Sequence, residues 1–153
     1  MADLQVTFIT TPEEMAEALM VRMRVFVEEQ GVPVAEEVDR YDADPASSTT
    51  AVHVLGRLDG VAVATARLLL DAHEGEYPHI GRVAVLLEHR RRGFGVAVMR
   101  VLQDEARRRG FAGITLSAQL HAIPFYERLG YVARGPFYMD AGIEHRDMDL
   151  AFA

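Results

Sequence analysis

The sequence of 153 residues contains no cysteine, which excludes disulfides, thiolate metal sites and a cysteine nucleophile. An acyl thioester formed on the protein itself is therefore excluded as well. Lysine is also absent, so all 16 basic residues are arginine. A chain without lysine cannot form the Schiff base that pyridoxal-type catalysis requires.

Long apolar runs are missing too: no stretch reaches the roughly 18 apolar residues that a membrane-spanning helix needs. The first residues, MADLQVTFIT, lack the basic start, apolar core and cleavage site of a secretory signal peptide. We therefore expect a cytoplasmic protein with no membrane partner. Since 50% of the residues are hydrophobic and the formal net charge is −7 at pH 7, we expect one well-packed domain over residues 1–153.

The N-terminal third predicts a short strand, a helix and an acidic loop. Residues 4–9 have a strand pattern, and Thr11, Pro12 and Glu14 resemble a capping box with proline in the first turn. A helix of about four turns follows from an apolar stripe at helical spacing. The members of this stripe are Met15, Leu19, Met23 and Phe26. Residues 28–44 are acidic and lose the periodicity, so we expect a loop or a broken short helix there.

The remaining sequence predicts a mixed sheet with helices. Residues 50–70 indicate two antiparallel strands joined at Asp59 and Gly60, a dipeptide that tolerates the positive φ of a tight turn. The final segment, residues 143–152, alternates like an edge or hairpin strand, so parallel and antiparallel pairing should mix near the C-terminus. The other predicted elements are a buried strand at 79–87, a helix at 96–110, a strand at 113–118, a short helix at 121–130 and a strand at 131–135.

The stretch EHRRRGFG places three arginines before a Gly-Phe-Gly turn, between a buried strand and a helix. Glycines in front of a helix let an anion approach the free N–H groups of its first turn. The stretch fits neither the Walker loop nor the dinucleotide fingerprint, which needs a small residue where this chain has Val98. The remaining pattern, Arg90-x-x-Gly93-x-Gly95, predicts a site for a ligand with several phosphates. A solvated basic corner is the alternative interpretation.

Two stretches in this order resemble the motifs of the GNAT superfamily of acetyltransferases. IGRVAVLLEHRRRGFGVAVM resembles the motif whose R/Q-x-x-G-x-G/A turn binds the pyrophosphate of acetyl-coenzyme A. LSAQLHAIPFYERLGY resembles the second motif, with Gln119 where asparagine is common. MRVFVEEQGVPVAEEVDRYD and AGIEHRDM are similar to the ElaA-like branch of small bacterial members. The resemblance implies an α/β fold with a mostly antiparallel sheet of about six to seven strands, a splayed central parallel pair and about four flanking helices.

The same resemblance implies how acetyl-coenzyme A would bind. The backbone of the central strand would pair with the pantetheine arm, and the arginine-glycine turn would hold the pyrophosphate. The implied cofactor-binding residues are Val83, Ala84, Val85, Arg90, Arg91, Arg92, Gly93, Phe94, Gly95, Val96, Gln119 and Tyr126.

The implied reaction is direct acetyl transfer to an amine of a small molecule or peptide in a ternary complex. Tyr126 is the implied proton donor to the departing thiolate, and its alternative interpretation is an aromatic core residue. Because a phenol has a reference pKa of about 10 and a thiol one of about 8.5, this tyrosine would assist rather than act as a strong acid. A backbone N–H near Val85 is the implied donor to the oxyanion.

The amine must also lose a proton, and the sequence leaves the accepting base open. Loop acids are commonly just solvated, and a lone histidine is commonly a satisfied polar residue. The candidates for the base and for acceptor binding are Glu29, Glu37, His79 and His145, with Glu29 also predicted as catalytic. The acids Glu36, Glu37 and Asp39 further predict an acidic surface that attracts a cationic amine. No metal is expected, because the ligand spacing of an EF-hand loop is missing.

Three other functions fit parts of the sequence. A non-catalytic module that binds acyl-coenzyme A as a sensor would share the same motifs. A nucleic-acid binder could use the arginines at 90–92 and 107–109, although the acidic balance and the lack of interleaved aromatics disfavour it. The stretch RVFVEEQ also resembles acyl-homoserine lactone synthases, for which the chain looks short. A homodimer formed through edge strands or exposed helices is a further expectation.

Overall fold

The structure, a computed structural model, describes residues 3–153. These residues form a seven-stranded sheet in the order β1-β2-β3-β4-β5-β7-β6. The strands are β1 Gln5–Phe8, β2 Ala51–Leu58, β3 Val61–Leu69, β4 His79–Val85, β5 Gly113–Gln119, β6 Val132–Asp140 and β7 Ile143–Ala151. The α-helices are α1 Pro12–Arg22, α2 Val34–Glu37, α3 Phe94–Arg108 and α4 Ile123–Arg128. The expected fold class is thereby confirmed.

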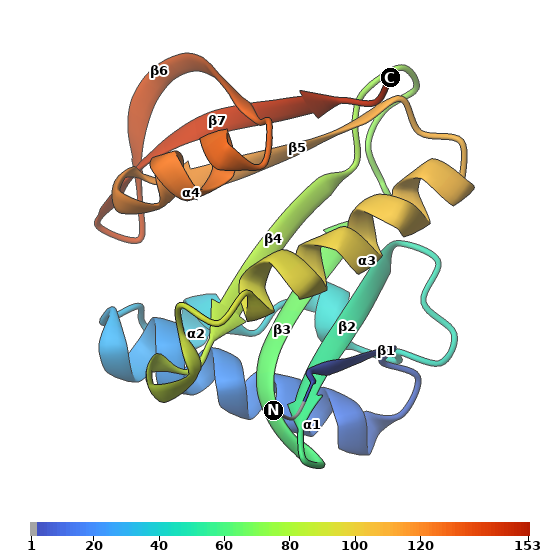
Figure 1. Cartoon of the computed structure of the whole chain (residues 1–153), viewed down its shortest axis with the longest axis vertical. Coiled ribbons are helices and arrows are strands. Elements are labelled where there is room, and N and C mark those ends of the chain that lie inside the picture. The colour runs from blue at the N-terminus through green and yellow to red at the C-terminus, as the bar shows by residue number, and fades with distance from the viewer. Residues whose placement is uncertain (1–2) are drawn as a thin grey trace.

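Helices cover both faces of the first half of the sheet. Figure 1 shows α3 passing in front of strands β2–β4 and α1 passing behind them. The main core lies between α3 and the sheet, where Leu68, Ile80, Met99 and Leu102 are fully buried. None of the helices within residues 3–153 is long and apolar enough to cross a membrane.

The N-terminal helix begins as predicted and then changes its winding. The Thr11 hydroxyl accepts a hydrogen bond from the Glu14 N–H at 3.1 Å, and the Glu14 carboxylate accepts one from the Thr11 N–H at 3.0 Å, which confirms the capping box. After α1 the chain continues as a π-helix, η1 Met23–Glu29. Such wider turns are typical of functional sites, and η1 reaches the cleft described below.

The predicted hairpin between β2 and β3 is also confirmed. Asp59 and Gly60 both have positive φ, 51° and 80°. A two-residue turn of this kind matches the right-handed twist of the strands that it joins.

The centre of the sheet opens where β4 and β5 meet. In the described chain these parallel strands pair at two positions, His79 with Thr115 and Ile80 with Leu116. Beyond Ile80 the strands diverge, as Figure 1 shows for β4 and β5. The expected splayed parallel pair is therefore present.

The last strand, β7, forms the predicted hairpin with β6 but is not at the edge of the sheet. It lies between β5 and β6, and β6 is the outer strand. Its alternating polar residues are satisfied by neighbouring strands: Asp149 accepts hydrogen bonds from Thr115 and Arg134, and Asp147 accepts one from Tyr138. The alternation that indicated an edge or hairpin strand thus reflects cross-strand pairing.

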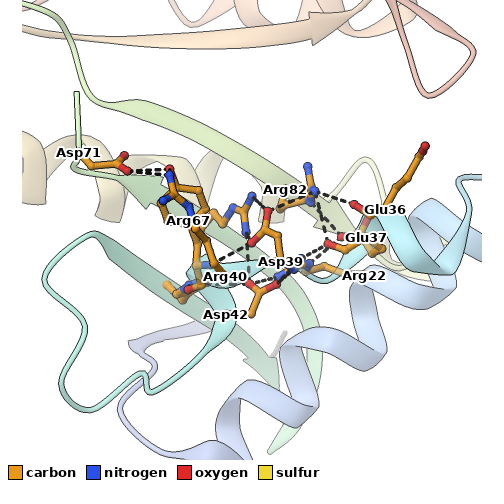
Figure 2. A network of polar contacts seen from close by, with 11 residues as sticks. Arg22, Glu36, Glu37, Asp39, Arg40, Asp42, Arg67, Asp71 and Arg82 are labelled. Atoms are coloured by element: carbon orange, nitrogen blue, oxygen red, sulfur yellow. Dashed lines mark hydrogen bonds and ion pairs between the residues drawn. The ribbon is translucent and has the colours of Figure 1, made fainter. Parts of the chain in front are cut away.

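The acidic segment forms α2 and a single 3-10 turn, η2 Arg40–Asp42, and its carboxylates are paired with arginines (Figure 2). Arg22 is 1% exposed and donates to Glu37 at 2.8 Å and to Asp42 at 2.6 Å. Arg67 contacts Asp39 at 2.7 Å and Asp42 at 3.3 Å. We refer to Arg22, Glu37, Asp39, Asp42, Arg67 and Arg82 as the ion network, in which the Asp39 and Arg82 side chains are 32% and 29% exposed.

The expected acidic surface for a cationic amine is therefore wrong for Glu37 and Asp39. Glu37 is 2% exposed and contacts both Arg22 and Arg82. The Asp39 carboxylate is held by Arg67 and by Arg82. Buried carboxylates need such partners, because an unpaired charge in a protein interior is strongly unfavourable.

We expect Asp42→Asn to destabilise the protein by about 3–5 kcal/mol, because it leaves two buried guanidinium groups short of one negative charge. The measurement is the free energy of unfolding in urea. Asp104→Asn is the matched control, since the Asp104 side chain is 76% exposed in its pair with Arg107 and its loss should cost less than about 1 kcal/mol. Equal losses in the two variants would contradict the structural role of the network.

Candidate functional site

A cleft of about 700 Å³ lies where β4 and β5 diverge. Its walls come from β4, the end of β5, η1, the arginine-glycine loop with the start of α3, and α4. Of the predicted site residues, those that line the cleft are Glu29, His79, Val83, Ala84, Val85, Arg90, Arg91, Gly93, Phe94, Gly95, Val96, Gln119, Tyr126 and His145. Arg92 and Glu37 are outside this lining.

The N-terminus of α3 opens into the cleft. Gly93 caps the helix with φ of 81°, a left-handed conformation that favours glycine. The first hydrogen bond of the helix runs from the Ala97 N–H to the Gly93 carbonyl at 3.0 Å. The amides of Phe94, Gly95 and Val96 therefore have no acceptor within this helix, all of which belongs to the described chain. Three N–H groups without a helical acceptor, at the positive end of a helix dipole, have the arrangement that suits an anion.

Arg90, in the arginine-glycine loop, forms hydrogen bonds with β4 on one side of the cleft and with η1 on the other. Its Nε donates to the Val85 carbonyl at 2.9 Å, and its Nη atoms donate to the Glu29 carboxylate at 2.6 and 2.7 Å. These hydrogen bonds from Arg90 lower the pKa of Glu29. A carboxylate with a lowered pKa is a weak base, so the geometry disfavours Glu29 as the proton acceptor.

The other two arginines of the triplet have different surroundings. Arg91 lines the cleft and has a positive φ of 64°. Arg92 instead lies against its own loop, with a guanidinium nitrogen 3.3 Å from His89 Nδ1 and its Cζ 5.0 Å from the centre of the Phe94 ring. The structure thus brings Arg90 and Arg91 into the cleft and turns Arg92 away from its lining.

Tyr126 lies on α4 within an aromatic cluster at the cleft. Its ring packs edge-on against Phe125 and Tyr131, with ring centres 5.1 and 5.9 Å apart. Burial raises the pKa of Tyr126, so its hydroxyl keeps its proton at neutral pH. The Tyr131 hydroxyl accepts a hydrogen bond from Gln103 at 2.7 Å, whereas Tyr126 belongs to the cleft lining.

His79 begins β4, and burial lowers its pKa, so the ring is neutral at pH 7. The ring extends along the strand over Gly81: a Cβ atom at position 81 would lie 3.7 Å from His79 Nε2. A side chain at position 81 would thus begin in ordinary van der Waals contact with this imidazole.

His145 reaches the cleft from β7. Its Nδ1 lies 2.7 Å from the Ile143 carbonyl, which can only accept, so we assign the ring proton to Nδ1. The ring stacks on Tyr138 with centres 6.0 Å apart. His145 is thus held firmly by its neighbours at one end of the cleft.

Gln119 bonds to a residue that the sequence did not single out. The amides of Gln119 and Gln30 exchange two hydrogen bonds, at 2.8 and 3.2 Å, across the cleft. This pair ties the end of η1 to the end of β5. The two residues are 89 positions apart in the chain, so the local sequence pattern does not predict that they are in contact.

Sequence reasoning also missed Arg82, which lines the cleft from β4 and contacts Glu37 at 3.0 Å. A signal was available, because arginines inside the apolar stretches IGRVAV, LMVRM and ATARLLL imply buried carboxylate partners. Such partners are present in the acidic segment 28–44, for which the sequence predicted a loop or a broken short helix.

The second arginine triplet does not form an open basic patch. Arg108 and Arg109 both donate to Glu105, at 2.6 and 2.7 Å, and Arg107 contacts Asp104 at 3.2 Å. The hydrogen bond from Arg108 is the largest cause that lowers the pKa of Glu105, to about 2. Acids on the same helix thus neutralise the charge that nucleic-acid binding would need.

Three comparisons agree with this geometry. The profile of the acetyltransferase (GNAT) family matches residues 14–131. The uncharacterized N-acetyltransferase YjcF of Bacillus subtilis (strain 168) is 34% identical over 137 residues, which are 89% of this chain and 91% of that protein.

Solved structures are similar as well. The crystal structure of an acyl-CoA N-acyltransferase from Pseudomonas aeruginosa has a TM-score of 0.84 and 31% identity, covering 97% of this chain and 100% of the other. Escherichia coli ElaA has a TM-score of 0.79 and 26% identity, covering 97% and 99%.

We expect Gly95→Val to weaken coenzyme A binding at least about tenfold, or about 1.4 kcal/mol. A side chain at position 95 points between Phe125 and Val85, whose atoms lie 3.4 and 3.8 Å from the position of its Cβ, and so narrows the cleft beside the free amides. Titration calorimetry with coenzyme A measures the effect. Ala97→Val, on the same helix but outside the cleft lining, is the control and should bind like the wild type. Equal affinity in the Gly95 variant would place the ligand elsewhere.

Proposed function

The chain belongs to the GNAT family of acetyltransferases, and we propose that it transfers an acetyl group from acetyl-coenzyme A to an amine of a small molecule or peptide. Both substrates would occupy the cleft together, as direct transfer requires. The observation that carries this proposal is the set of free amides at the start of α3, which face a cleft made by diverging strands.

The cleft offers groups of the right kind along its whole length. Phe94, Gly95 and Val96 supply N–H donors for a diphosphate, and the Arg91 guanidinium adds positive charge. From Gly81 to Val85, the edge of β4 that faces β5 lies beyond the last pair of these strands. The pantetheine arm of coenzyme A is extended and carries amides, so it can pair with such a strand edge through main-chain hydrogen bonds. The volume of about 700 Å³ lies within the range of small-molecule sites.

Arg90 would change partners when the substrates bind. It now holds the Val85 carbonyl and the Glu29 carboxylate. A phosphate can replace the carboxylate on the guanidinium, and an amide N–H can replace the guanidinium on the carbonyl. Glu29 is accordingly proposed as a partner of Arg90 and not as the catalytic base.

Tyr126 is proposed as the proton donor to the departing sulfur. Its raised pKa keeps the hydroxyl protonated until charge develops on the sulfur. Because the phenol is a weaker acid than a thiol, the proton moves as the carbon–sulfur bond breaks and not before.

His79 is proposed as the base. Its neutral ring can accept the proton that the amine nitrogen loses as it bonds to the acyl carbon. Backbone N–H groups of β4 donate to the carbonyl oxygen while it carries negative charge. At the end of the reaction His79 has gained one proton and Tyr126 has lost one, and exchange with solvent restores both residues. His145 stays a candidate for acceptor binding at the other end of the cleft.

We expect Tyr126→Phe to lower kcat by about 10²-fold or more while the Kd for coenzyme A stays unchanged, since a positioned acid contributes on that order. A thiol-release assay with acetyl-coenzyme A and a panel of amines, aminoglycosides and peptides measures kcat. Tyr77→Phe, outside the cleft lining, is the control and should keep the wild-type rate. Full activity of the Tyr126 variant would remove it from the chemical step. Binding of coenzyme A by the wild type without turnover on any amine would favour the non-catalytic sensor.

We expect kcat/KM to fall on the acid side of a pKa below 6.5, because burial lowers the pKa of His79 and its protonated ring cannot accept a proton. His79→Gln should lose this acid limb and about 10²-fold in rate. The measurement is kcat/KM of the variant divided by kcat/KM of the wild type at each pH, with the same acceptor. In this ratio the effect of the acceptor's own ionisation cancels. His145→Gln should retain the limb. An unchanged limb in the His79 variant would assign the base elsewhere.

A further inference from the structure

Strand β4 contains a bulge in the part of the strand that faces the cleft. Thr65 pairs with Ala84 and Arg67 pairs with Gly81, so Arg82 and Val83 together lie opposite the single residue Ala66. Arg82 has a φ of 52°, a left-handed conformation that is unfavourable for a residue with a Cβ atom. An arginine in this conformation must be held by its surroundings.

The Arg82 side chain supplies the contacts that hold it. Its Nε lies 3.0 Å from a Glu37 carboxylate oxygen, and its Nη2 donates to the carbonyls of Glu36 and Glu37 at 3.3 Å each. Figure 2 shows the guanidinium of Arg82 directed at the chain around Glu37, on the opposite side of that carboxylate from Arg22. The contacts of Arg82 with Glu36 and Glu37 therefore fix the bulge of β4 to the acidic segment.

The position of the bulge connects it to the chemistry. It begins at Arg82, two residues after Ile80, the last residue of β4 that pairs with β5. A bulge leaves an extra residue out of the ladder and redirects the backbone locally. The redirected stretch lies between His79, the proposed base, and Val85, whose carbonyl holds Arg90. The bulge changes the direction of backbone amides at the edge of β4, which is the edge proposed to contact the acyl group.

We propose that Arg82 is a positioning residue: its ion pair with Glu37 holds the β4 bulge in the left-handed conformation that aims the backbone amide of Val83, inside the bulge, at the acyl carbonyl. This inference rests on the proposed function. Arg82 acts through the backbone and does not contact the reacting atoms.

Substitutions at position 82 separate backbone conformation from charge. Arg82→Gly removes the guanidinium but also removes the steric penalty for positive φ, so the bulge should persist. Arg82→Ala removes the guanidinium and keeps the penalty, so the bulge should relax. Arg82→Asn and Arg82→Gln form a second such pair, because asparagine tolerates the left-handed region better than other residues with a Cβ atom.

We expect kcat of the glycine and asparagine variants to stay within about threefold of the wild type. The alanine and glutamine variants should lose about tenfold in kcat, which corresponds to about 1.36 kcal/mol. The Kd for coenzyme A should stay within about twofold in the glycine and asparagine variants, because the α3 amides are untouched and the edge of β4 keeps its conformation. If Arg82 only stabilised the fold through its charge, all four variants would lose the guanidinium and should be affected alike, whatever their tolerance of positive φ. Arg134→Ala, which removes the ion pair with Asp149 away from the cleft lining, is the control for loss of an arginine.

A second readout does not depend on activity. The ¹⁵N–¹H amide signals of Val83 and Ala84 should keep their wild-type positions in the glycine and asparagine variants and move in the alanine and glutamine variants. If one variant fails to fold, the other pair still gives the comparison. The inference is overturned if glycine and alanine lose kcat equally, or if the amide signals stay unchanged in all four variants. A wild type that binds coenzyme A but shows no turnover would defeat the proposed function alone, and the amide signals would still decide the role of Arg82.

Discussion

The structure depends on the compensation of two buried arginines and one partly exposed arginine by three carboxylates. Arg22 from α1, Arg67 from β3 and Arg82 from β4 contact Glu37, Asp39 and Asp42 of the acidic segment. Each charge would be strongly unfavourable alone in the interior, so the groups can be buried only together. Their shared burial fixes the segment after α1 against the sheet. The same contacts hold the bulge of β4, so one network stabilises the fold and shapes a wall of the cleft.

The opposite wall uses backbone instead of side-chain charge. The first turn of α3 presents free amides because a helix cannot satisfy its own first N–H groups. The divergence of β4 and β5 leaves a strand edge open beside them. The proposed anion site of a chain of net charge −7 therefore relies on local dipoles and on Arg91, while Arg108 and Arg109 are paired with Glu105.

Features set by a few neighbouring residues were predictable from the sequence. The capping box at Thr11 and Glu14, the turn at Asp59 and Gly60, and the glycine before α3 all have the predicted form. Features that depend on distant partners were not. The acidic segment was expected to be a loop or broken short helix whose acids attract a cationic amine, because its pattern cannot show that Arg22 and Arg67 pair with its carboxylates. The last strand was expected to be an edge or hairpin strand, and only the hairpin is present, because alternation does not tell which strand lies beyond it.

The sequence by itself determined the order of the elements, the arginine-glycine turn and the family resemblance, since each depends on residue type and short spacing. Only the tertiary structure decided which of the nominated polar residues share the cleft. It placed His79 and Tyr126 in the lining, bound Glu29 to Arg90, and buried Glu37 beneath Arg82. The physical reason is that the pKa and availability of an ionisable group are set by burial and by partners far away in the chain, and these exist only after folding.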